Sequence, residues 1–494
     1  MRLKYATLVN FVTNFLGLAA GLAFSVLIAR KLSVSEFGIW TIIFRYIGYV
    51  APFAVVFTYW LPRTISRGIN TAKTGLLLAA GLGAAASLVY IGIALAASTI
   101  LGQPLLYLLA ASIIVFLVYI ERCLSSIASS HAPQFTGISG FVSRLARILS
   151  AAVFVVGMRL GFLGAIAASI TARLSSISLL YRVNRNVIRE SRVSVETAKD
   201  WLSRSWLPLF ANFTNIAMTF DAIVVRCICG SDEPIAYYGI SAALLEVATA
   251  SAYARPALYA RLLARGDISD TVEAFWIASL LSIPVSIGLL LYAEPIVLMY
   301  GVKYSAISWV VRVFVLSSVL QIILSFLVTT LKGLEARDLY SGENLVGTVL
   351  FKVPLVRLFS NALYLLLVGA VAFAFRHDFI SLLLGWGIAF NAKLLLELIV
   401  YDKLLKREFR VSLPYKSMAV YALKFLLASL CIVLIRILLP IEKTTSIWVL
   451  GSRLGVVIAL SAAFYLCLLY VIDEKFRDLM HRAINMFTRK IVHE

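Results

Sequence analysis

The sequence predicts an all-α polytopic membrane protein with about 14 transmembrane helices. Of its 494 residues, 61% are hydrophobic and only 14% are charged, whereas an ordinary soluble domain has roughly 25% charged residues. The apolar residues form continuous runs of about 20, the length at which a helix crosses the hydrocarbon core of a bilayer. A run of this length in lipid satisfies its backbone hydrogen bonds as a helix. Little chain remains for a soluble catalytic domain.

The predicted spans follow one another with short connections. They cover residues 5–29, 39–61, 76–101, 105–121, 141–158, 164–181, 207–228, 240–262, 274–298, 307–331, 349–374, 380–402, 418–439 and 447–472. The first span follows Met1-Arg2-Leu3-Lys4 without a cleavage pattern of small residues, so we expect a retained helix. The segment 121–147, which joins the fourth and fifth spans and overlaps their ends, is expected to lie on the inner side.

Positive charge gives the orientation. The chain has 45 Lys and Arg against 25 Asp and Glu, a net charge of +20. With the N-terminus inside, most loop positives fall on the inner side, and the outer loops hold only Arg30, Lys31, Arg159, Lys303, Arg376 and Lys443. Cytoplasmic loops are enriched in Lys and Arg. We therefore expect a multi-pass protein of the cell membrane with both termini cytoplasmic, and the charge needs no nucleic-acid partner.

A basic cytoplasmic linker, residues 183–206, divides the spans. Spans 1–6 lie in residues 1–182 and spans 7–12 in 207–404, while spans 13–14 (418–472) and an amphipathic cytoplasmic tail (473–494) remain. A weak internal repeat supports the division, because Asn14 precedes Gly38 by 24 residues and Asn215 precedes Gly239 by the same number. Repeated bundles around a midplane site are common in secondary transporters.

Several charged residues fall within the predicted spans, where each costs at least ~2.5–3.5 kcal/mol at mid-depth. Five lie near span ends, where their side chains can reach the interface: Lys424, Arg226, Arg312, Arg436 and Arg453. Lys393 and Glu397 lie four residues apart on one helix, and could either neutralise each other or serve the function.

The charges that remain deep are mostly positive. They are Arg45, Arg173, Arg255 and Arg357, set against the acids Asp221 and Glu246. If they face inward, a cationic cavity between low-dielectric helices concentrates anions, and the planar guanidinium fork suits phosphate. The expected cargo is therefore anionic.

The second span adds Tyr49 and Pro52 on the same helical face as Arg45. Tyr49 could stack on a sugar or hydrogen-bond a phosphate, or it could simply pack. Pro52 is expected to release backbone carbonyls locally, as in the broken helices of transporters.

The missing motifs exclude other chemistry. The sequence has no phosphate-binding loop of an ATPase, and its five cysteines and four histidines lack metal-ligand or catalytic spacing, so we expect neither a metal nor another cofactor. The outer loops are too short for a membrane glycosyltransferase. We expect a transporter rather than an enzyme, driven by an ion gradient of H⁺ or Na⁺, the membrane potential or the substrate gradient.

The segment Ala29-Arg30-Lys31-Leu32-Ser33-Val34-Ser35-Glu36-Phe37-Gly38-Ile39-Trp40 resembles the turn after span 1 in the polysaccharide-biosynthesis, Wzx-like flippases of the multidrug/oligosaccharidyl-lipid/polysaccharide (MOP) exporter superfamily. Leu61-Pro62-Arg63, Ala236-Tyr237-Tyr238-Gly239 and Met299-Tyr300-Gly301 with Tyr304 are similar to further parts of the family pattern. With the layout of spans, the resemblance extends over essentially the whole chain.

The resemblance implies two six-helix lobes around a central cavity plus an accessory helix pair. It also implies alternating-access transport of a polyprenyl-pyrophosphate-linked oligosaccharide, in a membrane shared with glycan-assembly enzymes. The substrate-binding candidates are Arg45, Tyr49, Arg173, Arg255, Arg357 and Lys393, and the candidate cavity or ion-coupling acids are Asp221, Glu246 and Glu397. Family members that couple to sodium suggest Asn361 and Asn391 beside Asp221. The alternative is a MATE-like, cation-coupled exporter of small molecules that depends on Asp221 or Glu246.

Overall fold

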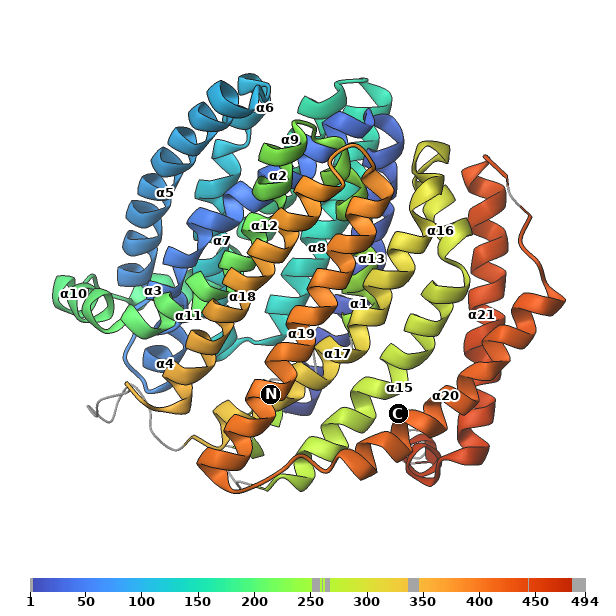
Figure 1. The fold of residues 1–494 in the computed structure, drawn as a ribbon. Helices are drawn as coiled ribbons and strands as arrows, with labels where there is room; N and C mark the ends of the chain where they lie inside the picture. The colour runs from blue at the N-terminus through green and yellow to red at the C-terminus, as the bar shows by residue number, and fades with distance from the viewer. Residues whose placement is uncertain are drawn as a thin grey trace, which may run out of the picture. The chain divides into compact units, whose positions relative to one another are not determined.

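The computed structural model of the chain describes residues 3–250, 258–259, 261–262, 267–335, 346–442 and 444–481, with the side chains of 3–12, 14 and 15 left aside. All regular structure in this part of the chain is helical (Figure 1), which confirms the predicted fold class. A cap of the expected kind opens the second helix: the Ser33 hydroxyl accepts from the Glu36 amide at 3.1 Å, and the Glu36 carboxylate accepts from the Ser33 amide at 2.9 Å.

The helices have the following bounds. Those before the predicted linker are α1 (Leu3–Lys31), α2 (Val34–Val50), η1 (Ala51–Ala54), α3 (Val55–Thr58), α4 (Leu61–Ser66), α5 (Ala72–Leu101), α6 (Leu105–Ala110), α7 (Ser112–His131), α8 (Gln134–Ala151), η2 (Ala152–Gly157) and α9 (Gly161–Glu190). Those after it are α10 (Val195–Arg204), α11 (Trp206–Ala217), η3 (Met218–Phe220), α12 (Asp221–Cys229), α13 (Glu233–Thr249), α15 (Ser269–Leu291), α16 (Ala293–Tyr300), η5 (Val302–Ile307), α17 (Ser308–Gly333), α18 (Val349–Ala374), α19 (Phe379–Phe409), α20 (Tyr415–Leu438) and α21 (Ile447–Ile472).

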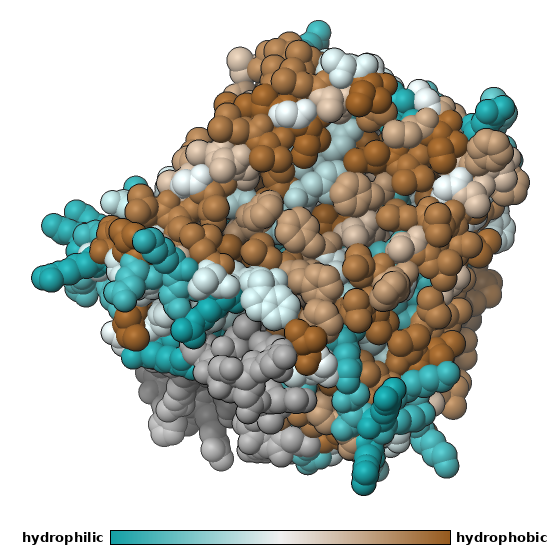
Figure 2. Space-filling model, turned by 60° about the vertical axis from the view of Figure 1, so that its left-hand side comes forward, coloured by the Kyte–Doolittle hydropathy of each residue, from teal (hydrophilic) through white to brown (hydrophobic). Residues whose placement is uncertain are grey.

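Twelve helices or unbroken helix runs among the described residues are long and apolar enough to cross a membrane. The 29-residue α1 and the shorter α13 occupy the two other predicted positions, so a count of about 14 agrees with the structure. Large apolar side chains face outward along these helices, and Leu88, Ile100 and Leu366 are 70%, 78% and 72% exposed. Figure 2 shows hydrophobic residues over most of the visible face, with hydrophilic ones mainly in its lower half. Such a surface requires an apolar solvent.

The long connection expected between the fourth and fifth predicted spans, within residues 121–147, is wrong. Helix α7 continues to His131 and α8 begins at Gln134, so only Ala132 and Pro133 connect them. The apolar run ends at Glu121 and Arg122, but the helix continues because both side chains have partners within the protein. Glu121 pairs with Arg173, and Arg122 donates to the Ala51 carbonyl at 2.9 Å. Arg122, Arg144 and Arg147 therefore lie within helices of the membrane region.

Helix α2 is broken at Pro52, as expected from the sequence. The helix ends at Val50, and the 3-10 turn η1 replaces the next α-helical turn. The carbonyls of Val50 and Ala51 accept hydrogen bonds from the Tyr119 hydroxyl and the Arg122 guanidinium, both on α7. Side chains of a neighbouring helix thus satisfy the irregular backbone within the membrane.

The chain divides into two compact units. Unit 1 comprises Met1–Gly239 and Arg337–Ala389, and unit 2 comprises Ile240–Ala336 and Phe390–Glu494. Within unit 1, α8 packs on α1 and α9, α5 packs on α7, and α18 packs on α11 and α12. Within unit 2, α15 packs on α17 and α20, and α20 on α21. The predicted division at 183–206 remains a prediction; α9 and α10 occupy most of that segment.

Candidate functional site

Two glycines bring the beginnings of α2 and α13 together in unit 1. A Cβ atom on Gly239 would lie 2.7 Å from the Thr41 hydroxyl oxygen, and one on Gly38 would lie 2.0 Å from the Asp232 carbonyl oxygen. Any larger residue would collide with the Thr41 side chain at position 239 and with the Asp232 backbone at position 38. Gly38 and Gly239 are the two glycines of the predicted internal repeat. Gly38 on α2 packs against the loop before α13, and Gly239 on α13 packs against α2.

A buried polar network holds the loop before α13. Asp232 Oδ1 accepts from the Gln103 side-chain amide at 2.7 Å and from Arg226 Nε at 2.9 Å, and Tyr46 donates to Gln103 Oε1 at 3.1 Å. We call these four residues the Asp232 network. Burial raises the pKa of the Asp232 carboxyl, although the Arg226 charge and the Gln103 hydrogen bond oppose the shift.

Arg45 lies one turn beyond Thr41 on α2 and reaches the residue before Gly239. Its Nη2 donates to the Tyr238 hydroxyl at 3.0 Å, and its guanidinium carbon lies 5.2 Å from the Tyr238 ring centroid. The Tyr238 ring stacks in turn on Trp386 of α19, with ring centroids 4.2 Å apart and 6° between the planes. The close packing of α2 and α13 therefore decides where this arginine points.

Asp221 is fully buried at the first position of α12. Its Oδ2 accepts from the Tyr364 hydroxyl at 2.8 Å and from Trp386 Nε1 at 3.2 Å, and its Oδ1 accepts from the Ala222 amide at 2.7 Å. Asp221 also interacts electrostatically with Arg45. Hydrogen bonds and an opposite charge are what a buried carboxylate requires. We call Arg45, Asp221, Tyr238, Tyr364 and Trp386 the Asp221 cluster.

Tyr49 holds the turn that precedes Asp221. Its hydroxyl donates to the Thr219 carbonyl at 2.8 Å, and its ring stacks on Phe220 with centroids 4.4 Å apart. Both residues belong to η3, which ends where α12 begins. Both contacts are with the protein itself, as expected if Tyr49 packs rather than binds a ligand.

Helix α18 carries a second polar face toward α11. Arg357 donates to the Asn215 side-chain oxygen, and one turn later Asn361 donates to the Thr214 carbonyl at 2.6 Å. The Asn361 Oδ1 is buried with no hydrogen-bond partner among the described residues. Arg357 and Arg45 thus both donate to neutral groups, a side-chain amide and a phenol.

The other candidates lie in different surroundings. Arg173 on α9 pairs with Glu121 on α7, and Lys393 on α19 lies 3.3 Å from Glu397. The Lys393 and Glu397 side chains are only 6% and 2% exposed. Glu246 is exposed on α13, in unit 2, and Asn391 donates to the Val313 carbonyl at 3.3 Å. Arg255 lies outside the described residues.

Sequence reasoning missed the aromatic members of the Asp221 cluster as site residues. Tyr364 follows Arg357 by seven positions and Asn361 by three, so helical spacing places all three on one face of α18. Tyr238 belongs to Ala236-Tyr237-Tyr238-Gly239, a segment noted only because it is similar to the flippase family pattern. No sequence pattern marks Trp386 as a site residue. Among the described residues, no group of three or more His, Cys, Asp or Glu could hold a metal ion.

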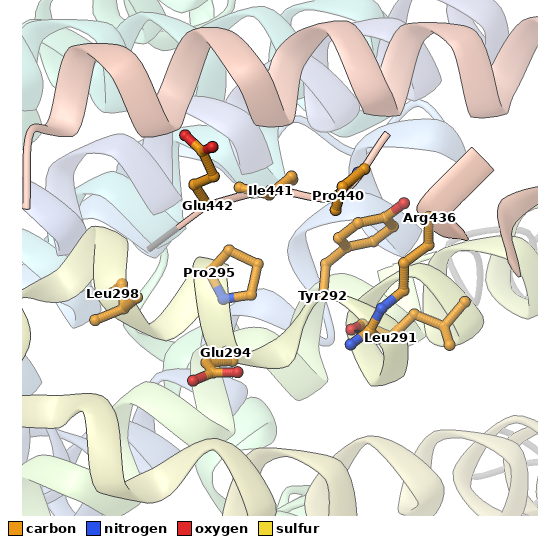
Figure 3. A pocket seen from close by; sticks show the side chains of 9 residues that line it. All are labelled: Leu291, Tyr292, Glu294, Pro295, Leu298, Arg436, Pro440, Ile441 and Glu442. Carbon is orange, nitrogen blue, oxygen red and sulfur yellow. Dashed lines mark hydrogen bonds between the residues drawn. The ribbon is translucent and has the colours of Figure 1, made fainter. Parts of the chain in front are cut away.

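A separate pocket of about 140 Å³ lies in unit 2, where α15 meets α16 and the connection between α20 and α21 passes (Figure 3). Arg436 lies beside Leu291, to whose carbonyl it donates, and over the Tyr292 ring at 5.7 Å. Arg312 donates similarly to the Leu290 carbonyl at 3.1 Å. These arginines satisfy backbone carbonyls at a helix end, and none of the predicted site residues lines the pocket.

Comparison with known proteins reveals this architecture elsewhere. An inward-facing multidrug resistance MATE family transporter of the MOP superfamily superposes with a TM-score of 0.62 and 13% identity, covering 82% of this chain and 99% of that chain. The lipid II flippase MurJ, in an inward closed conformation, also gives 0.62, with 14% identity over 96% of this chain and 100% of that chain.

The chain has the fold of the MOP superfamily transporters.

A further MOP structure, from Pyrococcus furiosus, whose binding pocket is described as having reverse polarity, gives a TM-score of 0.53 and 14% identity over 80% of this chain and 93% of that chain. No protein-family model and no curated protein matches the sequence. The MOP fold is thus retained here at sequence identities of 13–14%.

Proposed function

We propose that this protein transports a polyprenyl-pyrophosphate-linked oligosaccharide from the cytoplasmic to the outer leaflet of the cell membrane by alternating access. The observation that carries the proposal is the pairing of Arg45 and Arg357 with neutral groups. A guanidinium that donates to a phenol or an amide does not have its charge neutralised by that contact, and Arg45 interacts with the Asp221 carboxylate only electrostatically. Such a charge within membrane-spanning helices favours an anionic ligand over a cationic one.

The paired cations support the same distinction. Arg173 and Lys393 each have a carboxylate in direct contact, which Arg45 and Arg357 lack among the described residues. We assign Lys393 with Glu397 a structural role, and Arg45 and Arg357 the pyrophosphate. A planar guanidinium can bond two phosphate oxygens at once, and the ligand would replace the Tyr238 and Asn215 contacts.

Asp221 provides the opposite charge when no ligand is present. Its carboxylate attracts the Arg45 guanidinium and so stabilises this cation. Trp386 links the two residues, because it donates to Asp221 and stacks on Tyr238, the hydrogen-bond partner of Arg45. In the proposed cycle the pyrophosphate takes over this compensation, and Asp221 with Asn361 could then accept the coupling cation, H⁺ or Na⁺. We also propose, from the sequence alone, that both termini are cytoplasmic, that residues 1–182 and 207–404 form the two lobes, and that Arg255 and Glu246 belong to the substrate cavity.

The test is leaflet exchange in proteoliposomes. A pyrophosphate-linked oligosaccharide is placed on one face, and its arrival at the other is followed by lectin accessibility. Arg45→Ala and Arg357→Ala should each reduce the exchange rate by about tenfold or more, since a charge-assisted hydrogen bond contributes about 1.5–3 kcal/mol. Arg312→Ala, which removes an arginine that donates to a helix-end carbonyl, is the matched control and should exchange normally.

Normal exchange by both Arg45→Ala and Arg357→Ala would contradict the assignment of the site. The buried carboxylate of Asp221 favours a second candidate, a cation-coupled exporter. That candidate predicts uptake of small organic cations which Asp221→Asn abolishes and Arg45→Ala leaves intact.

A further inference from the structure

Unit 1 contains a second group of cations, on helices other than those of Arg45 and Arg357. Arg122 lies on α7, Arg144 and Arg147 on α8, and Arg173 on α9, with Glu121 on α7 as the acid among them. We call these five residues the arginine cluster. All lie well inside their helices, in runs that are long and apolar enough to span the membrane.

The five side chains interact with one another. Arg173 is paired with Glu121, and both are about one-fifth exposed. Arg173 also repels Arg122 and Arg147, Arg144 repels Arg147, and Glu121 attracts both Arg122 and Arg147. One carboxylate, Glu121, therefore interacts with three of the four guanidinium groups. In a medium of low dielectric constant, such an excess of like charge is costly unless an anion compensates it.

Two of the arginines have unused donors inside the protein. The Nε atoms of Arg147 and Arg173 are buried with no hydrogen-bond partner among the described residues. The Arg147 guanidinium lies over the Phe24 ring, 5.3 Å from its centroid. A buried donor without an acceptor costs about 1–3 kcal/mol, so a site that keeps two of them is incomplete without a ligand.

A glycine of α1 accommodates the Arg144 side chain. A Cβ atom on Gly17 would lie 2.5 Å from Arg144 Nη1 and 3.0 Å from its Cδ. Gly17 is thus a cradle for a guanidinium, in addition to any role in helix approach. Arg122 donates through Nη1 to the Ala51 carbonyl at 2.9 Å, and a guanidinium has further N–H donors besides this one.

We propose that the arginine cluster is a second anion site, which binds a phosphate-bearing group through Arg122, Arg144 and Arg147, with Arg173 held by Glu121 at its edge. Three guanidinium groups from two helices, α7 and α8, match the several oxygens of a phosphate or pyrophosphate better than the single charge of a carboxylate. The ligand could be the pyrophosphate of a lipid-linked glycan or the headgroup of an anionic phospholipid. The inference does not depend on transport, because it concerns equilibrium binding by other residues.

The test measures binding of radiolabelled inorganic pyrophosphate to the purified protein in nanodiscs of phosphatidylcholine. The background variant is Arg45→Ala/Arg357→Ala, which removes the proposed transport site. It should still bind pyrophosphate, and Arg147→Gln added to it should weaken binding by about tenfold or more. Unchanged affinity on adding Arg147→Gln and Arg122→Gln would overturn the proposal, whereas loss of transport alone would not bear on it.

A variant of opposite expected effect separates binding from misfolding. Glu121→Gln removes the one acid of the cluster, so pyrophosphate should bind more tightly, by about three- to tenfold. Weaker binding by Glu121→Gln in protein of normal unfolding temperature would contradict the charge argument. Nanodiscs that contain phosphatidylglycerol identify the source: competition with pyrophosphate supports a phospholipid headgroup, and undiminished pyrophosphate binding supports the diphosphate of a glycan carrier.

Discussion

The close approach of Gly38 to Asp232 in unit 1 predicts a large effect for a single methyl group. In Gly38→Ala the new Cβ would lie 2.0 Å from the Asp232 carbonyl oxygen and 2.7 Å from its carbonyl carbon. The obstacle is backbone and cannot rotate away. Cβ atoms are essentially never found closer than 3.0 Å to such atoms, so the loop before α13 must move by about 1 Å.

The displacement acts on the Asp232 network. The hydrogen bonds from Gln103 and Arg226 to Asp232 measure 2.7 and 2.9 Å, and a shift of about 1 Å takes both beyond hydrogen-bonding range. Overpacking costs about 1–3 kcal/mol, and each charge-assisted hydrogen bond about 1.5–3 kcal/mol. We therefore expect Gly38→Ala to lower the free energy of unfolding by about 3 kcal/mol or more.

Gly48 on the same helix is the matched control, because a Cβ atom there meets nothing within 4 Å. Gly48→Ala should stabilise α2 by about 0.5–1 kcal/mol, since alanine loses less conformational freedom than glycine in a helix. Both variants are compared by equilibrium unfolding in mixed micelles, with helix content followed by circular dichroism. If Gly38→Ala unfolds at the same denaturant concentration as Gly48→Ala, the close approach of α2 to the Asp232 loop is refuted.

Three further predictions concern other sites. Lys393→Met should lower the free energy of unfolding by about 3–5 kcal/mol because it removes the salt-bridge partner of the buried Glu397 carboxylate, and Lys393→Met/Glu397→Leu should recover most of this loss in the same micelle assay. A double variant as unstable as the single one would contradict this assignment. The pKa of Asp232 is raised in the folded protein, so its contribution to stability is present at low pH and is lost as the pH rises through that pKa. Asp232→Asn should remove this part of the pH dependence of the unfolding temperature. An unchanged pH profile would show that Asp232 does not cause it. Gly17→Ala should fold normally, since the flexible Arg144 end can move, yet bind pyrophosphate several-fold more weakly, and unaltered affinity would show that Gly17 does not position Arg144.

The sequence predicted the helices well because lipid is their solvent, and a hydropathic run of sufficient length then has one structural solution. It failed at Glu121 and Arg122, since a charged pair resembles the end of a span unless its partners are known. Those partners, Arg173 and Ala51, are 52 and 71 residues away in the sequence. The same failure hid Arg144 and Arg147, because they lie in the segment 121–147 that was counted with the inner positive charges.

The candidate site was predictable only in part, for a related reason. Arg45 and Asp221 stood out because charge within an apolar run is costly. Their partners did not, because Tyr238 is 193 residues from Arg45, and Tyr364 is 143 residues from Asp221. Such contacts depend on how α2, α12, α13 and α18 pack, which local periodicity does not encode. The structure was likewise needed to show that Arg357 donates to a neutral amide, whereas Arg173 pairs with a carboxylate.

The most direct test of the central claim compares two cargoes in the same proteoliposomes. Leaflet exchange of a pyrophosphate-linked oligosaccharide and gradient-driven uptake of a small organic cation are measured for the wild type, Arg45→Ala and Asp221→Asn. We expect glycan exchange that Arg45→Ala abolishes, and no cation uptake by any of the three proteins. Cation uptake that Asp221→Asn abolishes and Arg45→Ala spares, without glycan exchange, would contradict it.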